Sequence, residues 1–311
     1  MTDFYHVSVL LDECLEGLNI KPDGIYVDGT LGGAGHSSQI AKRLTTGRLI
    51  GIDRDPVALK AAGERLAPFG DRVTLVHSNF CEIAQVLKSL NIDGVDGILL
   101  DLGVSSPQLD DGSRGFSYMA DAPLDMRMNN EDALTAHEVI NSWSFEELKR
   151  ILYDYGEERY APRIAAAICS RRETKPIETT LELVDIIRGA MPAAALREKQ
   201  HPAKRSFQAI RIAVNDELGS VEKVMKDAVP CLNPGGRLAV ITFHSLEDRI
   251  VKNAMAEAAK GCTCPPSFPV CVCGKKPLVN LVSRKPIVSG DEELERNPRA
   301  RSAKLRVCEK I

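Results

Sequence analysis

Residues 27–37 read Val-Asp-Gly-Thr-Leu-Gly-Gly-Ala-Gly-His-Ser, a glycine-rich turn between a predicted strand and a predicted helix. The apolar residues 25–27 predict the strand, and the pattern of residues 37–44 predicts the helix. A second apolar run, residues 49–52, ends at Asp53. In α/β proteins this arrangement forms a crevice for a nucleotide-like ligand, because the glycines let the backbone approach the ligand and the acid accepts both ribose hydroxyls.

The turn departs from the form that binds a dinucleotide. Counted from Gly33, Ser38 stands where the third glycine of G-x-G-x-x-G would be, and that glycine normally allows close packing beside a pyrophosphate. S-adenosylmethionine has no phosphates, and its carboxylate can bind the N–H groups of a helix N-terminus. We therefore favour S-adenosylmethionine, while a nicotinamide or flavin cofactor and a tight turn without a ligand remain alternatives.

Composition indicates a globular chain rather than a generic basic nucleic-acid binder. Its 311 residues are 44% hydrophobic and 27% charged, with a formal net charge of −3. Residues 159–211 nevertheless carry 11 Lys and Arg against 5 Asp and Glu, and residues 275–306 carry 9 against 4. Such segments suit a local polyanion site, and we expect the first segment, including Lys204 and Arg205, and the basic tail to provide it. Solvated helix faces are the alternative.

Targeting signals are absent from the sequence as given. No apolar run approaches about 18 residues, which excludes a membrane-spanning helix, and residues 1–6 lack the basic start and apolar core of a signal peptide. We expect a cytoplasmic protein that does not bind membranes. Its nine cysteines are then free thiols or metal ligands in a reducing compartment.

Strands and helices alternate along the first third of the chain, which predicts a parallel sheet. Residues 105–205 contain no convincing strand, and strand character returns only at residues 237–243. We therefore predict an α/β core, residues 1–104 and 206–311, with an inserted helical domain at 105–205. The strands are expected at 24–28, 48–53, 72–77, 97–102 and 237–243, and helices at 37–44, 56–66, 83–90, 135–141, 145–155, 161–172, 180–191 and 207–231.

Asp101 ends the fourth predicted strand, at the sheet edge where α/β proteins bind ligands. The following Ser106-Pro107-Gln108 partly matches the acid/Ser/Asn-Pro-Pro-aromatic tetrad of methyltransferases that act on amines of nucleic acids. An exocyclic amine is a poor nucleophile, and oxygen acceptors for its N–H bonds raise its lone-pair density. Asp101 and Ser106 are therefore candidate catalytic residues, and a loop stabilised by their side chains is the alternative.

His244 follows the fifth strand and is a third catalytic candidate, as a hydrogen-bond partner of the amine or, alternatively, a packed histidine. Ser245 and Asp248 behind it are predicted to cap a helix.

Four cysteines form two Cys-x-Cys pairs in a proline-rich segment that lacks a helical pattern. Four thiolates suit tetrahedral zinc, so we predict a structural zinc site. Redox or chance clustering is the alternative, because the spacing is not Cys-x₂-Cys. The cysteines are Cys262, Cys264, Cys271 and Cys273.

The chain resembles the bacterial 16S ribosomal RNA cytosine-N4 methyltransferase family of the RsmH or MraW type. The match is carried by long blocks spread over nearly the whole sequence, which is more specific than any single motif. These blocks are residues 6–13, 28–37, 52–55, 100–110, 114–117, 123–128, 155–159, 207–211, 243–249 and 297–302.

The resemblance implies a class I, Rossmann-like methyltransferase fold with an inserted all-helical domain. It implies methyl transfer from S-adenosylmethionine to N4 of a decoding-centre cytidine, with 16S ribosomal RNA or the small ribosomal subunit as substrate. It leaves open whether the protein is a monomer or a homodimer. A dinucleotide-dependent dehydrogenase and a non-catalytic ribosome assembly factor are the competing functions. The implied cofactor contacts are Ala34, Gly35, His36, Asp53, Phe80, which would flank the adenine, Asp101 and Gln108.

Overall fold

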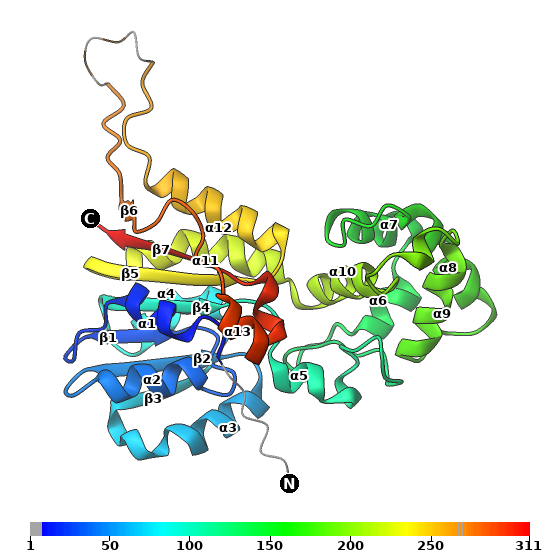
Figure 1. Ribbon diagram of the computed structural model, residues 1–311, viewed down its shortest axis with the longest axis horizontal. Coiled ribbons are helices and arrows are strands. Elements are labelled where there is room, and N and C mark those ends of the chain that lie inside the picture. The colour runs from blue at the N-terminus through cyan, green and yellow to red at the C-terminus, as the bar shows by residue number, and fades with distance from the viewer. Residues whose placement is uncertain (1–7, 266–267, 269, 271) are drawn as a thin grey trace. The chain divides into compact units, whose positions relative to one another are not determined.

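The computed structural model describes residues 8–265, 268, 270 and 272–311, apart from the side chain of Ser106. The chain forms two compact units (Figure 1). The first comprises the chain up to Gly103 and from Leu218 onward, and the second is Val104–Glu217. Within the described residues, none of the helices has both the length and the apolar character required to cross a membrane.

A seven-stranded sheet forms the centre of the first unit, with the strand order β3-β2-β1-β4-β5-β7-β6. β1 to β5 are parallel, and β7 runs antiparallel between β5 and β6. This confirms the predicted α/β, Rossmann-like class I fold. The strands are β1 (Ile25–Asp28), β2 (Arg48–Asp53), β3 (Val73–His77), β4 (Val95–Asp101), β5 (Leu232–Thr242), β6 (Val279–Leu281) and β7 (Lys304–Lys310).

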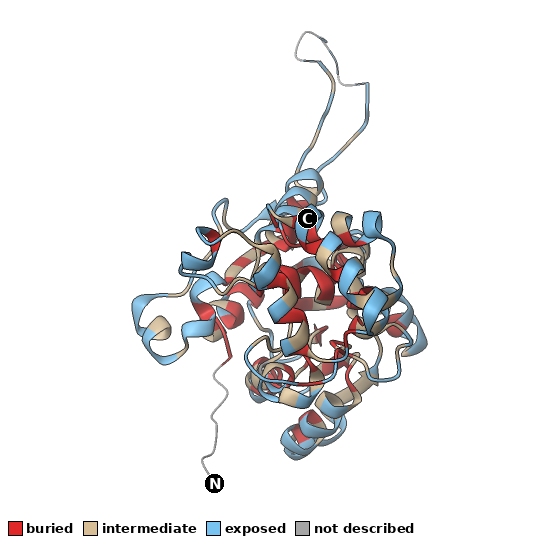
Figure 2. Cartoon of the chain, turned by 90° about the vertical axis from the view of Figure 1, so that its right-hand side faces the viewer, coloured by how far each residue is buried: buried red, intermediate tan, exposed pale blue. Residues whose placement is uncertain are grey.

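Alternate residues of the buried strands face two separate apolar layers. Val27 belongs to the layer that includes α4, α11 and α12, whereas its neighbour Tyr26 belongs to the layer that includes α1 and α2. Both faces of the sheet are therefore covered, as expected for a parallel sheet, and Figure 2 shows the buried residues concentrated inside. The helices of this unit are α1 (Leu11–Leu18), α2 (Gly35–Arg43), α3 (Pro56–Leu66), α4 (Ile83–Ser89), α11 (Glu217–Cys231, starting at the unit boundary), α12 (Ser245–Ala258) and α13 (Asp291–Arg296).

The strand order changes direction at β1, which lies between β2 and β4. The carboxyl ends of these three strands are Asp28, Asp53 and Asp101. A switch point of this kind is where open α/β sheets bind their ligands, so the topology brings three acidic residues to the ligand-binding edge.

The second unit is helical. Its core joins apolar side chains from α6 to α10 and from the preceding loop, and Thr135, Ser144 and Thr179 cap three of its helices through their hydroxyl oxygens. Its helices are α5 (Ser106–Asp110), α6 (Ala136–Ser142), α7 (Phe145–Asp154), α8 (Ala161–Thr174), α9 (Thr180–Ala190) and α10 (Lys204–Asn215).

The end of this unit differs from the predicted boundary at residue 205, because α10 packs with the second unit. The continuous helix predicted for residues 207–231 is two helices, interrupted at Asp216, which has a left-handed backbone (φ 45°). Asn215 fixes the break: its side chain accepts from Met128 N (2.7 Å) and donates to Met126 O (2.8 Å). The helical spacing of apolar residues in the sequence continues across this position, so it cannot reveal such a break.

Candidate functional site

The side chain of Asp28 holds the glycine-rich turn between β1 and α2 through hydrogen bonds. This buried carboxylate accepts hydrogen bonds from Thr30 N (3.1 Å) and from the Ser37 hydroxyl (2.7 Å). Between these contacts the backbone is left-handed at Gly32 (φ 48°) and Ala34 (φ 56°). One buried acid therefore ties both ends of the turn together.

Two glycines of this stretch allow close packing. A Cβ on Gly35 would lie 1.9 Å from Ser8 Oγ. A Cβ on Gly29 would lie 2.6 Å from Leu100 Cδ2 and 3.1 Å from Phe80 Cβ. Side chains at either position would force the backbone away, and the second contact places Phe80 beside the start of the turn.

Asp53 is bound to the same turn. Its Oδ2 accepts from Gly32 N (2.7 Å) and its Oδ1 from Asp55 N (2.8 Å). A carboxylate offers about four acceptor positions, so about two remain available to a ligand. Burial raises the pKa of Asp53 to about 6, against the effect of the two N–H donors.

Asp101 and His36 meet at the end of β4. His36 Nε2 lies 2.9 Å from Val9 O, and Nδ1 lies 3.8 Å from Asp101 Oδ2. The backbone N–H of Asp101 donates to Thr30 Oγ1 (2.6 Å). Within the part of the chain that the structure describes, the buried Oδ1 of Asp101 has no hydrogen-bond partner. It is therefore an unused acceptor at the ligand-binding edge.

The three carboxylates interact electrostatically. Burial raises the pKa of Asp101 to about 6, and nearby Asp28 raises it further while His36 opposes the change. Burial likewise raises the pKa of Asp28 to about 6, against the donors Ser37 and Thr30. Negative charges held together at the cost of desolvation suit a cationic ligand, and S-adenosylmethionine carries a sulfonium and an ammonium group.

His244 is the N-cap of α12. Its Nδ1 accepts from Glu247 N (3.4 Å), and its Nε2 lies 3.1 Å from Glu247 Oε1. Glu247 in turn accepts from Phe243 N (3.0 Å) through Oε2. Among the described residues the buried Nε2 has no hydrogen-bond partner despite its short distance from Glu247, so the capping role accounts for Nδ1 alone.

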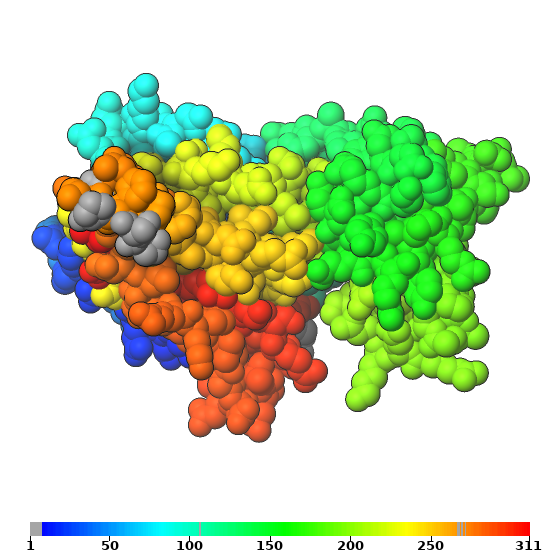
Figure 3. All heavy atoms as spheres, turned by 90° about the horizontal axis from the view of Figure 1, so that it is seen from above, coloured from blue at the N-terminus to red at the C-terminus, as the bar shows by residue number. Residues whose placement is uncertain are grey.

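The predicted cap made by Ser245 and Asp248 is wrong. His244 occupies the cap position, which shifts the cap one residue toward the N-terminus. Asp248 binds β7 instead, with Oδ1 2.7 Å from Arg306 Nε and Oδ2 3.2 Å from Lys304 Nζ. Figure 3 shows α12, in yellow, next to the red C-terminal segments on the surface of this unit.

Gln108 and Ser106 belong to the second unit, whereas the other predicted site residues belong to the first. Gln108 is buried and forms a capping box with Ser105: its Oε1 accepts from Ser105 N (3.1 Å), and its N–H donates to Ser105 Oγ (3.4 Å). The side chain of Ser106 lies outside the described residues.

Of the predicted zinc ligands, Cys262, Cys264 and Cys273 lie together, and Cys271 lies outside the described residues.

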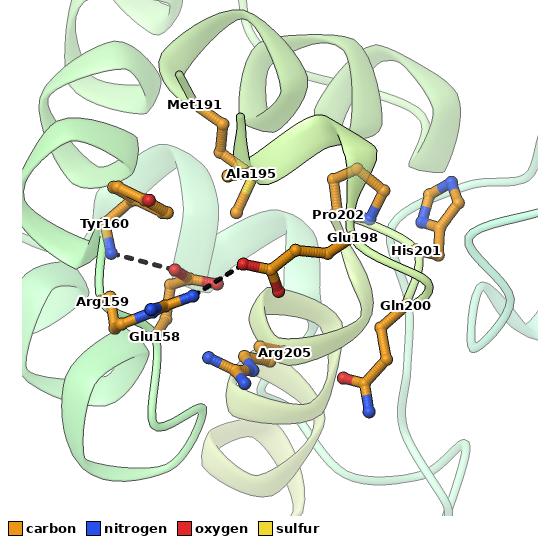
Figure 4. Close-up of a pocket in the computed structure, with 10 residues that line it drawn as sticks. All are labelled: Glu158, Arg159, Tyr160, Met191, Ala195, Glu198, Gln200, His201, Pro202 and Arg205. Atoms are coloured by element: carbon orange, nitrogen blue, oxygen red, sulfur yellow. Dashed lines mark hydrogen bonds and ion pairs between the residues drawn. The ribbon is translucent and has the colours of Figure 1, made fainter. Parts of the chain in front are cut away.

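The second unit contains a small pocket that the sequence did not predict (Figure 4). Arg159 forms an ion pair with Glu198 (2.7 Å), and Arg205 donates to Glu157 O (3.3 Å). Burial lowers the pKa of His201, whose ring stacks on Tyr118 with centroids 4.6 Å apart. The lining residues are Glu158, Arg159, Tyr160, Met191, Ala195, Glu198, Gln200, His201, Pro202 and Arg205.

Comparison with known proteins shows similarity over the full length. Residues 3–311 match the model of the MraW methylase family. A protein of Brevibacillus brevis named ribosomal RNA small subunit methyltransferase H is 60% identical over 309 residues, covering 99% of this chain and 98% of the relative. Proteins of the same name from Heliobacterium modesticaldum and Clostridium botulinum are 60% and 59% identical, each covering 99% of this chain and 99% and 100% of the relative.

Proposed function

The chain belongs to the MraW methylase family, and from this premise we propose that it methylates the exocyclic N4 amine of a decoding-centre cytidine in 16S ribosomal RNA. It is an S-adenosylmethionine-dependent methyltransferase of the type that acts on small-subunit ribosomal RNA. The relatives carry that name; the choice of cytidine, of N4 and of the decoding centre is our proposal. The observation that supports this proposal most directly is that Oδ1 of Asp101 has no hydrogen-bond partner among the described residues. Asp101 ends β4, next to the turn that Asp28 and Asp53 hold.

Cofactor binding is assigned to the turn and the strand ends around it. We assign the ribose hydroxyls to Asp53, since its two bonds to backbone N–H groups fix its position and leave acceptor capacity. Phe80, beside Gly29, is assigned to the adenine. The remaining proposed contacts are Ala34, Gly35, His36, Asp101 and, from the second unit, Gln108.

The methyl group that the cofactor supplies is electrophilic, so the protein must mainly orient the amine and raise its nucleophilicity. Asp101 Oδ1 can accept an N–H bond from the amine and stabilise the positive charge that develops on nitrogen. We assign this role to Asp101, with Ser106 and His244 as further candidates. His244 caps α12 through Nδ1, and its buried Nε2 has no hydrogen-bond partner among the described residues, so Nε2 is the atom of this ring that could contact the amine.

We propose a direct transfer without a covalent enzyme–base intermediate. Methylation at a ring carbon of cytosine would need a cysteine thiolate beside the base. The cysteine nearest to the site in sequence is Cys81, which is buried, and burial raises the pKa of its thiol. An exocyclic amine has its own lone pair and needs no such nucleophile.

Binding of RNA is assigned to the basic segments. Lys204 is exposed at the start of α10, and the neighbouring Arg205 lines the pocket of Figure 4. Arginine beside stacked aromatic and imidazole rings is a common arrangement for nucleotides, and Tyr118 and His201 provide the stack.

The test compares the cytidines of small-subunit ribosomal RNA, by mass spectrometry, with and without this protein. We expect one N4-methylated cytidine, mapped to the decoding centre by nuclease fragments, to depend on the protein. Asp101→Asn should lower the rate of transfer at saturating cofactor by about 100-fold, with Asp71→Asn, an exposed acid of the same unit, as the control. Methylation at a ring carbon, or of no cytidine at all, would contradict the proposal.

A further inference from the structure

Three cysteines converge in the segment between α12 and β6. The Sγ atoms of Cys262, Cys264 and Cys273 all lie within 4.8 Å of one another. The Sγ atoms of Cys262 and Cys273 are 3.7 Å apart. Sulfur atoms at these separations can contact one metal ion together, since zinc–sulfur bonds are about 2.3 Å long.

Backbone N–H groups point at these sulfur atoms. Thr263 N donates to Cys273 Sγ (3.4 Å), Cys264 N donates to Cys262 Sγ (3.4 Å), and Val272 N donates to Cys264 Sγ (3.3 Å). Hydrogen bonds to sulfur favour the thiolate over the thiol.

The segment between α12 and β6 buries few of its apolar side chains, so packing contributes little to its stability. Figures 1 and 2 both show its two sides running next to each other and away from the sheet. Its large apolar side chains are exposed: Phe268 by 50%, Val270 by 71%, Val272 by 73% and Leu278 by 58%. Short stretches without a core are ordinarily stabilised by a disulfide or a metal, and the cysteines are the groups here that can supply one.

We propose that Cys262, Cys264 and Cys273 bind one zinc ion that fixes this segment. Thiolates are soft ligands and zinc accepts them in tetrahedral sites without redox chemistry. The fourth ligand predicted by the sequence, Cys271, lies outside the described residues, and its contribution is decided by experiment rather than assumed.

The site is structural, because topology separates it from the ligand-binding edge. α12 starts where β5 ends and runs back along it, so its last residue, Ala258, lies toward the opposite edge. β6 starts there, since Leu278 N donates to Ala258 O (2.8 Å). Val279 pairs with Lys310, at the end of β7 opposite to Lys304, the partner of Thr242. Loss of the metal should therefore leave cofactor binding intact.

The first test measures metal in the full-length protein purified without chelator. We expect about one zinc per chain, falling at least fivefold in Cys262→Ser, Cys264→Ser and Cys273→Ser. Cys231→Ser, a thiol in α11 whose pKa is raised by burial, is the matched control and should keep its zinc. Loss of zinc in Cys271→Ser assigns the fourth ligand, and its retention assigns a three-thiolate site.

The second test uses wild-type protein and does not depend on a variant folding. A mercurial thiol reagent should release the zinc, and reduction followed by added zinc should restore it. Hydrogen exchange of residues 260–278 should rise on release, while the affinity for S-adenosylmethionine stays within twofold. Full-length protein without zinc, a disulfide between Cys262 and Cys273, or zinc unchanged in the serine variants would overturn the proposal; a failure of RNA methylation would not.

Discussion

Replacing Asp28 by Asn should stabilise the first unit, and the gain should grow with pH. Asp28 is 2% exposed, and its pKa is raised from 3.8 to about 6 by burial. The folded form therefore keeps a proton that the unfolded chain has already lost between pH 3.8 and 6. The contribution of Asp28 to the free energy of unfolding is therefore greatest below pH 3.8 and is lost as the pH rises through the folded pKa.

The magnitude follows from the size of the shift. A change from 3.8 to about 6 corresponds to about 3 kcal/mol over the complete titration. About 1.4 kcal/mol of this falls between pH 5 and pH 8. Asparagine is neutral throughout, and its amide can still accept from Thr30 N and donate to Ser37 Oγ. The wild type should therefore lose about 1.4 kcal/mol relative to Asp28→Asn over this interval.

Urea unfolding at pH 5, 6, 7 and 8 measures the difference, followed by hydrogen exchange of the β1 and β2 amides. The single tryptophan, Trp143, lies in the second unit, so its fluorescence reports a transition that the substitution should leave unchanged. Asp71→Asn, at an exposed position, is the control. If the difference in free energy of unfolding between Asp28→Asn and wild type were constant with pH, the reasoning would be refuted. If the difference grew toward low pH, folding would lower the pKa of Asp28 rather than raise it.

Three further predictions concern ligand binding and chemistry. Asp53→Ala should weaken S-adenosylmethionine binding by about 100-fold or more, through the loss of two charge-assisted hydrogen bonds; unchanged affinity in calorimetry would remove Asp53 from the ribose site. Cys81→Ser should retain appreciable activity and no protein–RNA adduct should be trapped, whereas a cysteine adduct detected by mass spectrometry would disprove direct transfer. Lys204→Ala with Arg205→Ala should weaken RNA binding and reduce the salt slope by about 1–2 units, with cofactor affinity unchanged; identical salt dependence in both proteins would mean that these residues are only solvated.

Local patterns in the sequence were sufficient for most of the α/β unit. Buried parallel strands are continuous apolar runs, and the helix at Pro56–Leu66 starts with a proline that fits its first turn. β6 and β7 were not predicted. β7 is partly exposed and its sequence is interrupted by charged residues, and its place between β5 and β6 depends on long-range pairing that no local window contains.

The position of Asp53 at the carboxyl end of β2 was predictable, because an apolar run that ends in an acid is a local pattern. The sequence did not reveal what holds that residue. Asp28 belongs to the quoted motif, yet its bonds to Thr30 and Ser37 depend on the shape of the turn. The cap at His244 was missed because histidine is an unusual N-cap, and only the geometry shows that its Nδ1 accepts from the Glu247 N–H.

The first unit is discontinuous in sequence, and this has a consequence for how the protein folds. β4 pairs with β5 across the whole of Val104–Glu217, so that Asp101 lies opposite Ile241. Contacts between such distant segments slow folding, because the entropy of closing the intervening loop is lost before the contacts form. A second unit that has already folded replaces that long flexible loop by a compact body. Substitutions in its core, at Ile151 or Leu183 for example, should therefore retard completion of the sheet during refolding, although neither residue belongs to it.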